Sequence, residues 1–200
     1  MKKQPFVASW SGGKDSAMAY YRAVQSGMTP KRLLTMFQED EEVSKSHALP
    51  LKVVQAQAAR LDLPLMIRGA GWDDYESKFI DAMDECRADG ITHGVFGDID
   101  LEGHLEWVQK TCAKSGIVPI HPLWQEPRRS ILEELLAVGF EAVIVVVNTN
   151  MMPAEYVGRI FTRQWMDELE SLGIDSCSEN GEFHTRVIDV LIFSSRVTVT

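Results

Sequence analysis

The stretch Ser9-Trp10-Ser11-Gly12-Gly13-Lys14-Asp15-Ser16, called here the glycine loop, lies between two segments of different character. The apolar run Phe6–Ser9 before it predicts a strand. After it, Met18, Tyr21 and Val24 recur at the spacing of one helix face, which predicts a helix. Glycines let a backbone turn sharply, and a helix N-terminus offers free N–H groups and a positive dipole end. The stretch therefore predicts a strand–loop–helix unit that binds phosphate.

The polar side chains of the glycine loop strengthen this interpretation. Lys14 supplies a cation, the serines supply hydroxyl donors, and Asp15 is suited to hold a metal or to order the loop. The loop matches neither the Walker A pattern nor the dinucleotide fingerprint Gly-x-Gly-x-x-Gly. The alternative is a plain glycine turn before an N-capped helix.

Short apolar runs and amphipathic segments alternate along most of the chain. The runs lack polar alternation, as buried parallel strands do. This order predicts an α/β fold with a mostly parallel sheet and helices on both of its faces. The expected strands are Phe6–Ser9, Arg32–Phe37, Leu65–Arg68, His93–Phe96, Val118–His121 and Ala142–Val147.

The C-terminal part has a different pattern. Prolines at 122 and 127 bracket a short segment, and Val187–Thr200 is rich in β-branched residues that favour strands. We expect a domain comprising residues 1–123, followed by a small C-terminal α+β subdomain comprising residues 124–200.

Composition restricts the classes of protein that fit. The chain has 200 residues, 45% of them hydrophobic, and 20 Lys+Arg against 29 Asp+Glu give a net charge of −9. These values are typical of a globular protein, and the acidic balance disfavours broad nucleic-acid binding. The three cysteines cannot all pair within one chain, the longest aliphatic run is too short to span a bilayer, and no apolar stretch of a signal peptide follows Lys2 and Lys3. We expect a cytoplasmic protein with no membrane partner.

A second polar cluster, the C-terminal motif, comprises residues Cys177 to Thr185. The carboxylates of Glu179 and Glu182 are suited to bind Mg²⁺ or to orient an amine nucleophile, and His184 is suited to move protons near neutral pH. The alternative is a plain β-hairpin, because Asn180-Gly181 is a strong type I′ turn signal.

Two further positions are candidates for the same edge of the sheet. Asp98 follows the fourth expected strand, so that it would lie near the glycine loop; the alternative is an aspartate that caps the next helix. His47 lies in a loop and either lines the pocket or serves as a turn residue.

Residues Ser11–Ser16 resemble the PP-loop of the ATP-pyrophosphatase superfamily, which has a Rossmann-like (adenine nucleotide alpha hydrolase-like) fold. That superfamily cleaves ATP between the α and β phosphates and adenylates an oxygen atom, after which a nucleophile displaces AMP. The resemblance implies that Asp15 lies near Mg²⁺ and that adenine lies near Met36 and Phe37. It also implies a pyrophosphate site made by Ser9, Ser11, Gly12, Gly13, Lys14 and Ser16.

The C-terminal motif is similar to the signature Glu-x-Gly-Glu-Phe/Tyr-x-Thr of diphthine–ammonia ligase-like proteins. Bacterial-type members of that group read Cys-Gly-Glu-Asn-Gly-Glu-Phe-His-Thr, and Ser178 stands where this longer pattern has Gly. Ser46–Pro50 resembles a His-Gly-x-Pro loop of the family, with Ala48 in place of Gly, and Gly97–Ile99 resembles its Gly-Asp-Ile. The catalytic residues implied by the resemblance are Lys14, Asp15, Glu179, Glu182 and His184. The implied substrate-binding residues are His47, Gly97, Asp98, Asn180, Gly181, Phe183 and Thr185.

The resemblance implies an ATP-dependent ligase that uses Mg²⁺, releases AMP and pyrophosphate, and forms an amide with ammonia. Its substrate would be a carboxylate on a small molecule or on a modified protein side chain. Alternatives are an ATP-binding sensor without turnover, and a PP-loop enzyme that acts on a small molecule or on tRNA. The charge of −9 and the lack of a Cys-x-x-Cys pair disfavour tRNA as the substrate. We also expect that the chain can form a homodimer.

Overall fold

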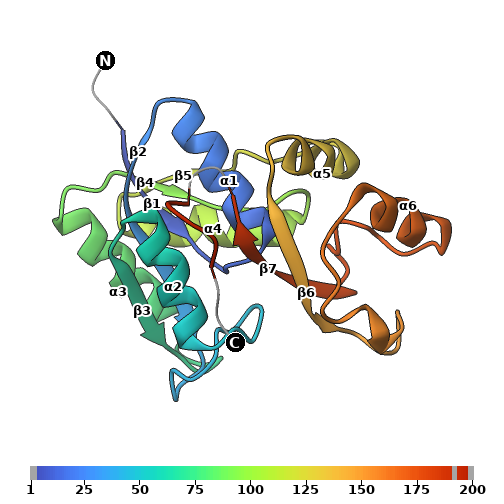
Figure 1. The fold of residues 1–200 in the computed structure, drawn as a ribbon. Coiled ribbons are helices and arrows are strands. Elements are labelled where there is room, and N and C mark those ends of the chain that lie inside the picture. Colours follow the sequence, from blue (N-terminus) through green and yellow to red (C-terminus); the bar gives the residue numbers. More distant parts are fainter. Residues whose placement is uncertain (1–3, 191–192, 198–200) are drawn as a thin grey trace.

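The computed structural model describes residues 4–190 and 193–197. Its centre is a five-stranded sheet with the strand order β3-β2-β1-β4-β5, in which every pair is parallel (Figure 1). The strands are β1 (Pro5–Ser9), β2 (Thr29–Phe37), β3 (Leu65–Gly69), β4 (His93–Val95) and β5 (Val118–Ile120). The predicted α/β fold with a parallel sheet is confirmed.

Helices cover both faces of this sheet. Successive residues of β2 point to opposite faces, and Leu33 and Leu34 accordingly belong to two different apolar clusters. Helices α1, α2 and α5 contribute to the cluster around Leu33, and helices α3 and α4 contribute to the cluster around Leu34. The helices are α1 (Lys14–Gln25), α2 (Leu51–Leu61), α3 (Tyr75–Ala88), α4 (Glu102–Lys114) and α5 (Arg128–Ala137).

The sixth expected strand does not extend the parallel sheet. It forms β6 (Glu141–Val147), which pairs antiparallel with β7 (Phe183–Asp189) in a separate two-stranded sheet. Ala142 and Ile144 of β6 lie on one face of the strand and are buried, whereas Val146, which follows a register shift after Ile144, is exposed. The prediction that β6 belongs to the parallel sheet is therefore wrong. The strand that pairs with β6 comes from a segment about 40 residues further along the chain, which the repeating strand–helix order does not reveal.

The last strand also begins earlier than predicted. The strand expected within Val187–Thr200 is β7, which starts at Phe183, inside the C-terminal motif. Residues 191–192 and 198–200 of the expected strand lie outside the described residues. Between β6 and β7 the chain forms the short 3-10 helix η1 (Ala154–Tyr156) and helix α6 (Arg163–Ser171).

One apolar cluster joins the parallel sheet to the C-terminal segment. It contains Phe6 and Trp10 from the first strand and loop, and Trp165, Phe183 and Val187 from the C-terminal part. The rings of Trp165 and Phe183 meet edge to face, with centroids 5.2 Å apart. The division into residues 1–123 and 124–200 stays a prediction. Among the described residues, no helix is long and apolar enough to cross a membrane.

Strand β7 packs against the glycine loop and the start of α1 (Figure 1). The backbone N–H of Val187 donates to the carbonyl of Gly12, with an N–O distance of 2.9 Å. The C-terminal segment therefore lies over the carboxyl ends of β1 and β4, where open parallel sheets bind their ligands.

Candidate functional site

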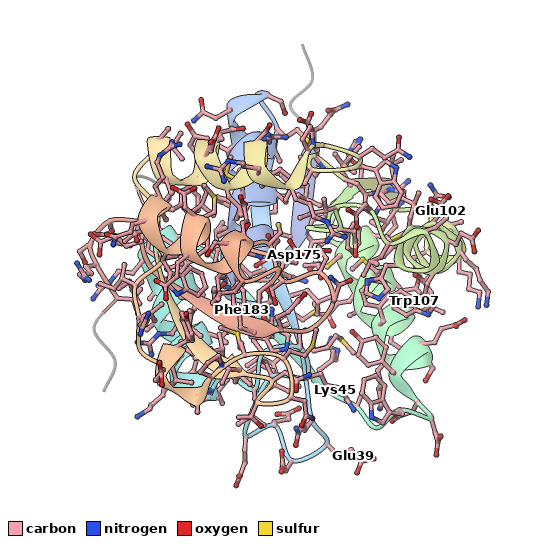
Figure 2. All side chains as sticks on the ribbon, turned by 90° about the vertical axis from the view of Figure 1, so that its right-hand side faces the viewer. Glu39, Lys45, Glu102, Trp107, Asp175 and Phe183 are labelled. Carbon is pink, nitrogen blue, oxygen red and sulfur yellow. The ribbon has the colours of Figure 1, made fainter. Side chains whose placement is uncertain are left out.

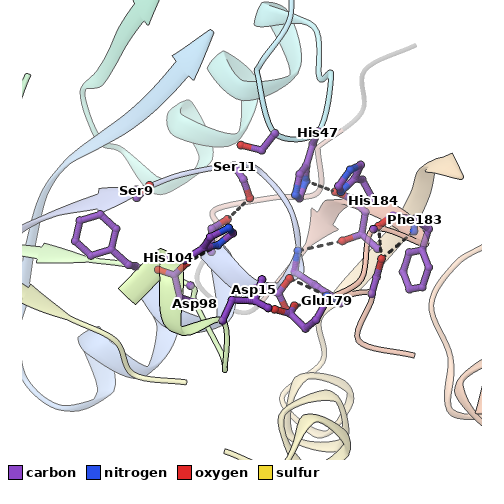
Figure 3. A pocket seen from close by; sticks show the side chains of 18 of the residues that line it. Ser9, Ser11, Asp15, His47, Asp98, His104, Glu179, Phe183 and His184 are labelled. Atoms are coloured by element: carbon purple, nitrogen blue, oxygen red, sulfur yellow. Dashed lines mark hydrogen bonds and ion pairs between the residues drawn. The ribbon is translucent and has the colours of Figure 1, made fainter. Parts of the chain in front are cut away.

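A cavity of about 360 Å³ lies where the glycine loop, the loop after β4 and the C-terminal motif meet (Figure 3). Its volume falls in the range of small-ligand pockets. In the view of Figure 2, Asp175 and Phe183 of the C-terminal segment lie to one side and Trp107 of α4 lies to the other. The cavity is therefore shared between the parallel sheet and the C-terminal part.

Most of the predicted site residues line this cavity. They are Ser9, Ser11, Lys14, Asp15, Ser16, His47, Gly97, Asp98, Glu179, Gly181, Phe183, His184 and Thr185. The lining also includes residues that the sequence did not single out as site residues, which are Ser46, Phe96, Leu101, His104, Val108 and Ser178. The predicted residues outside the lining are Gly12, Gly13, Met36, Phe37, Asn180 and Glu182.

The glycines of the loop are needed for close packing rather than for contact with the cavity. Gly12 has φ +81°, a conformation that suits glycine. A Cβ on Gly13 would lie 2.1 Å from the ring of His47. Gly13 is also the N-cap of α1, and no side chain caps that helix. Instead the first helical N–H, that of Lys14, donates to Oγ1 of Thr185 at 3.1 Å. The side chain that caps α1 thus comes from the C-terminal motif and not from the loop itself.

The ammonium group of Lys14 is buried between the glycine loop and the C-terminal motif. It donates to both carboxylate oxygens of Asp15, at 2.9 and 2.7 Å, and to the carbonyl of Cys177. Burial lowers the pKa of Lys14, but the neighbouring acidic groups, Asp15 first among them and then Cys177 and Glu179, together outweigh burial and raise the pKa above its ordinary value. Lys14 therefore stays charged, as a phosphate-binding lysine must.

Asp15 and Glu179 form a pair of facing carboxylates. Their ligand atoms and the thiol of Cys177 all lie within 4.8 Å of one another. Burial, followed by the negative charge of Asp15, raises the pKa of Glu179 to about 7. Burial raises the pKa of Cys177 to about 12, so the thiol stays neutral. The two carboxylates fit Mg²⁺, which prefers oxygen ligands, and the neutral thiol does not.

His47 and His184 stack on each other at one end of the cavity, with ring centroids 4.7 Å apart (Figure 3). Nδ1 of His47 lies 3.0 Å from the carbonyl of Thr185. Burial, then the neighbouring His184 and Lys14, lower the pKa of His47 to about 3. Burial and the charge of Lys14 also lower the pKa of His184. Both rings are therefore neutral at pH 7, and a neutral imidazole can accept a proton.

Asp98 lies at the opposite end of the cavity, between two histidines. Its carboxylate oxygens are 3.4 Å from Nδ1 of His104 and 3.5 Å from Nε2 of His121. The alternative role of Asp98 as a helix cap is wrong, because the N-cap of α4 is Leu101 and no side chain caps that helix. His104 had no local signal of its own in the sequence, and only the position of α4 brings it to Asp98.

The loop after β4 reaches the glycine loop through Gly97. A Cβ at Gly97 would lie 2.9 Å from backbone atoms of Asp15 and of Ser16. Only a glycine lets the two loops approach so closely, so that Gly97 sets the width of the cavity.

The structure does not bring Met36 and Phe37 to the cavity. Both side chains are buried in the apolar core. The carbonyl of Met36 accepts from the N–H of Lys45, and the carbonyl of Phe37 accepts from the N–H of Ala70. These two acceptors are already engaged, and an adenine contact near this strand end stays a prediction.

Glu182 and Asn180 order the C-terminal motif from within. The Glu182 carboxylate is buried and accepts from the backbone N–H and the side-chain amide of Asn180, both at 3.1 Å. The element before this turn is helix α6 and not a strand, so the β-hairpin alternative is wrong. Asp175 also orders the motif, because its carboxylate accepts from the N–H groups of Cys177 and Glu179 at 3.0 and 2.9 Å. The role of Asp175 could have been predicted from the sequence, because an aspartate often accepts from the N–H two residues further on, as in an Asx turn.

The fold and the cavity define a parallel α/β protein with a pocket at the glycine loop. A family model described as the diphthamide synthase N-terminal domain matches residues 4–119, and one described as the C-terminal domain matches residues 127–200. The chain belongs to the diphthamide synthase family. This confirms the resemblance to diphthine–ammonia ligase-like proteins.

Relatives of known name are similar over nearly the whole chain. A protein of Danio rerio named diphthine–ammonia ligase is 22% identical, over 94% of this chain and 84% of its own length. The protein of the same name from Rattus norvegicus is also 22% identical, over 94% of this chain and 80% of its own length. That of Schizosaccharomyces pombe is 23% identical, over 95% of this chain but only 35% of its own length.

A solved structure is similar in fold. It is described as a predicted subunit of tRNA methyltransferase from Methanocaldococcus jannaschii. The TM-score is 0.51 at 14% identity, over 94% of this chain and 97% of the other. At this identity the likeness shows a shared fold and carries nothing on function.

Proposed function

We propose that this protein is an ATP-dependent ligase that adenylates a carboxyl or carbonyl oxygen, releases pyrophosphate and AMP, and joins ammonia to the activated carbon to form an amide. The observation that carries the proposal is the meeting of Lys14 with Asp15 and Glu179 in one cavity beside a helix N-terminus. Membership in the diphthamide synthase family, with relatives named as ligases, supports this class of reaction and the use of ATP.

Each group has a chemical task in this reaction. The glycine loop and Lys14 bind the departing pyrophosphate and stabilise the charge that develops on it. Glu179, with a pKa near 7, takes a proton from the attacking nucleophile. His184 is neutral and also lines the cavity, so that it can take the proton that ammonium loses before attack, while Glu179 takes the proton released as the amide forms. Glu182 supports the turn that holds Glu179 and does not line the cavity.

Asp15 would hold Mg²⁺, which neutralises phosphate charge when it is bound, and this leaves Glu179 free to act as the base. The carbon substrate would lie toward Asp98 and His104, where the cavity continues beyond the glycine loop. A carboxylate on a small molecule and one on a modified protein side chain both remain substrate classes for this site. The adenine position near Met36, a homodimer and a cytoplasmic location stay predictions.

Phosphorus NMR tests the reaction class. The protein is incubated with Mg-ATP alone, with deproteinised cell extract, or with whole extract that still contains protein acceptors. AMP and pyrophosphate that require extract, and that disappear with Lys14→Ala, support the ligase. Turnover only in whole extract indicates a protein substrate. ADP and phosphate would contradict the proposal, and ATP binding without products in any arm would leave a sensor.

We expect Glu179→Gln to reduce turnover at least about a hundredfold, which is the usual contribution of a general base. The affinity for ATP should change little, because the amide keeps the shape of the carboxylate. Glu182→Gln is the companion variant, and its defect should be one of stability, since Glu182 bonds Asn180 rather than lining the cavity. Equal loss of turnover and ATP binding in Glu179→Gln would argue against a catalytic role.

A further inference from the structure

Gln57 is a fully buried polar residue in the middle of α2, outside the cavity lining. Its carbonyl oxygen accepts from the indole N–H of Trp10 at 2.9 Å. Its amide nitrogen donates to the carbonyl of Gly12 at 2.9 Å and to the carbonyl of Val187 at 2.8 Å. The side chain of Gln57 thus forms hydrogen bonds with Trp10 and Gly12 of the glycine loop and with Val187 of β7.

These partners use both donors of the amide, together with its acceptor, in one orientation. The reverse orientation would set the amide oxygen against two carbonyls and the amide nitrogen against the indole N–H. The same Gly12 carbonyl also accepts from the N–H of Val187 at 2.9 Å. Gln57 therefore completes a closed network in which loop, helix and strand hold one another.

The fit around this network is tight. A Cβ on Gly12 would lie 2.7 Å from Oε1 of Gln57, so the loop backbone packs directly on the amide. An apolar side chain at position 57 would leave the indole N–H and a carbonyl of Val187 without this partner in a buried place, which is costly. The amphipathic pattern of α2 does not explain a glutamine here, since the other buried residues of the helix are Val53, Val54 and Ala58.

We propose that Gln57 is the positioning residue of the glycine loop, and that its amide sets the affinity for ATP by fixing Gly12 against β7. The second part rests on the proposed function, because it takes the glycine loop as the phosphate site. Gln57 acts through the loop and touches neither nucleotide nor reacting atoms.

The chain offers a matched control two residues earlier. Gln55 lies on the same helix and is exposed. Gln57→Leu should weaken Mg-ATP binding about tenfold or more, because buried hydrogen bonds at the loop are lost. Gln55→Leu should bind as the parent protein does. Isothermal titration of each purified full-length protein with Mg-ATP measures the difference.

The variant Gln57→Glu adds a second measurement, the pH dependence of Mg-ATP affinity, which a residue with a purely structural role would not change. Burial against two carbonyls raises the pKa of a glutamate placed there. At low pH its neutral carboxyl still donates one hydrogen bond, whereas at high pH the carboxylate faces Gly12 and Val187 carbonyls that repel it. The loss of Mg-ATP affinity should therefore grow as pH rises from about 5 to about 8. Gln55→Glu should follow the pH profile of the parent protein.

Amide hydrogen exchange of the protein without nucleotide tests the positioning separately. Residues 11–14 and 183–187 should exchange faster in Gln57→Leu than in Gln55→Leu. Unchanged exchange there, or unchanged Mg-ATP affinity in Gln57→Leu, overturns the proposal. If the parent protein bound no Mg-ATP, the proposed function would fail while the exchange result still decided whether Gln57 positions the loop. If Gln57→Leu fails to fold, Gln57→Glu at low and high pH supplies both measurements on one chain.

Discussion

At Ala48 and Ser178 the backbone adopts left-handed conformations, with φ of 51° and 64°. A residue with a Cβ is strained in this region, by about 1–2 kcal/mol. These are the two positions at which the sequence departs from a glycine in the related motifs. Only Ser178 has an evident compensation, because its hydroxyl bonds the N–H and the carbonyl of Phe183.

Ala48→Gly should therefore raise the free energy of unfolding, by up to about 1 kcal/mol after the greater freedom of glycine in the unfolded chain is counted. Ser178→Gly relieves the same strain but loses two hydrogen bonds, so we expect no gain or a net loss. Urea unfolding of both variants measures the difference. A larger gain at position 178 than at 48 would contradict this account.

The His47–His184 stack makes stability depend on pH in a defined direction. The pKa of His47 is lowered to about 3, so the unfolded chain binds a proton near pH 6.5 that the folded chain does not. Stability should therefore fall as pH drops from about 6.5 toward about 3, with a slope of at most about 1.4 kcal/mol per pH unit from this group. In His47→Gln this contribution should be absent, which urea unfolding across the pH range would reveal as a shallower slope.

Among the elements, the pair of loops after β1 and β4 fixes the shape of the cavity. Their contact depends on Gly97, whose missing side chain lets the loop lie against the backbone at Asp15 and Ser16. Helix α4 contains a second glycine, Gly103, with nothing within 4 Å of an added Cβ. The two glycines therefore form a matched pair for the same substitution.

Gly97→Ala should lower the free energy of unfolding by about 1–3 kcal/mol, because backbone atoms must move apart. It should also weaken ATP binding, since the glycine loop shifts with them. Gly103→Ala should be neutral or stabilising by up to about 1 kcal/mol, because alanine favours a helix more than glycine does. Thermal unfolding and ATP titration of both proteins make the comparison, and similar effects at the two sites would refute it.

Across the whole molecule, the C-terminal segment and the parallel sheet share one core. Trp165 and Phe183 belong to the same apolar cluster as Phe6 and Trp10. The ion pairs of Arg128 with Asp100 and with Asp175, at 2.7 and 2.6 Å, add a polar link between the loop after β4 and the C-terminal part. The cluster on one face of the parallel sheet is therefore complete only when both parts are folded.

The chain should therefore unfold in a single cooperative transition. Far-UV circular dichroism reports the helices, and tryptophan fluorescence reports the packing around the five tryptophans, of which Trp10 and Trp165 lie in the shared cluster. The urea midpoints of the two signals should coincide. Two separated transitions would mean that residues 1–123 and 124–200 fold as independent domains.

The sequence by itself determined the features that depend on neighbouring residues. Glycines before a helix predicted the loop, apolar runs predicted the five parallel strands, and the C-terminal motif predicted Glu179 and His184 in the cavity. These signals are local because turns, helix starts and buried strands depend on the residues within a few positions.

Only the tertiary structure decided which distant segments meet. In the structure β6 pairs with β7 and not with the parallel sheet, His104 lies beside Asp98, and the Glu182 side chain bonds within its own turn and does not reach the cavity. It also placed Gln57 under the loop, a residue whose sequence neighbours give no sign of its partners. Strand pairing and buried hydrogen bonds join residues far apart in the chain, so that their partners are fixed by packing and not by local pattern.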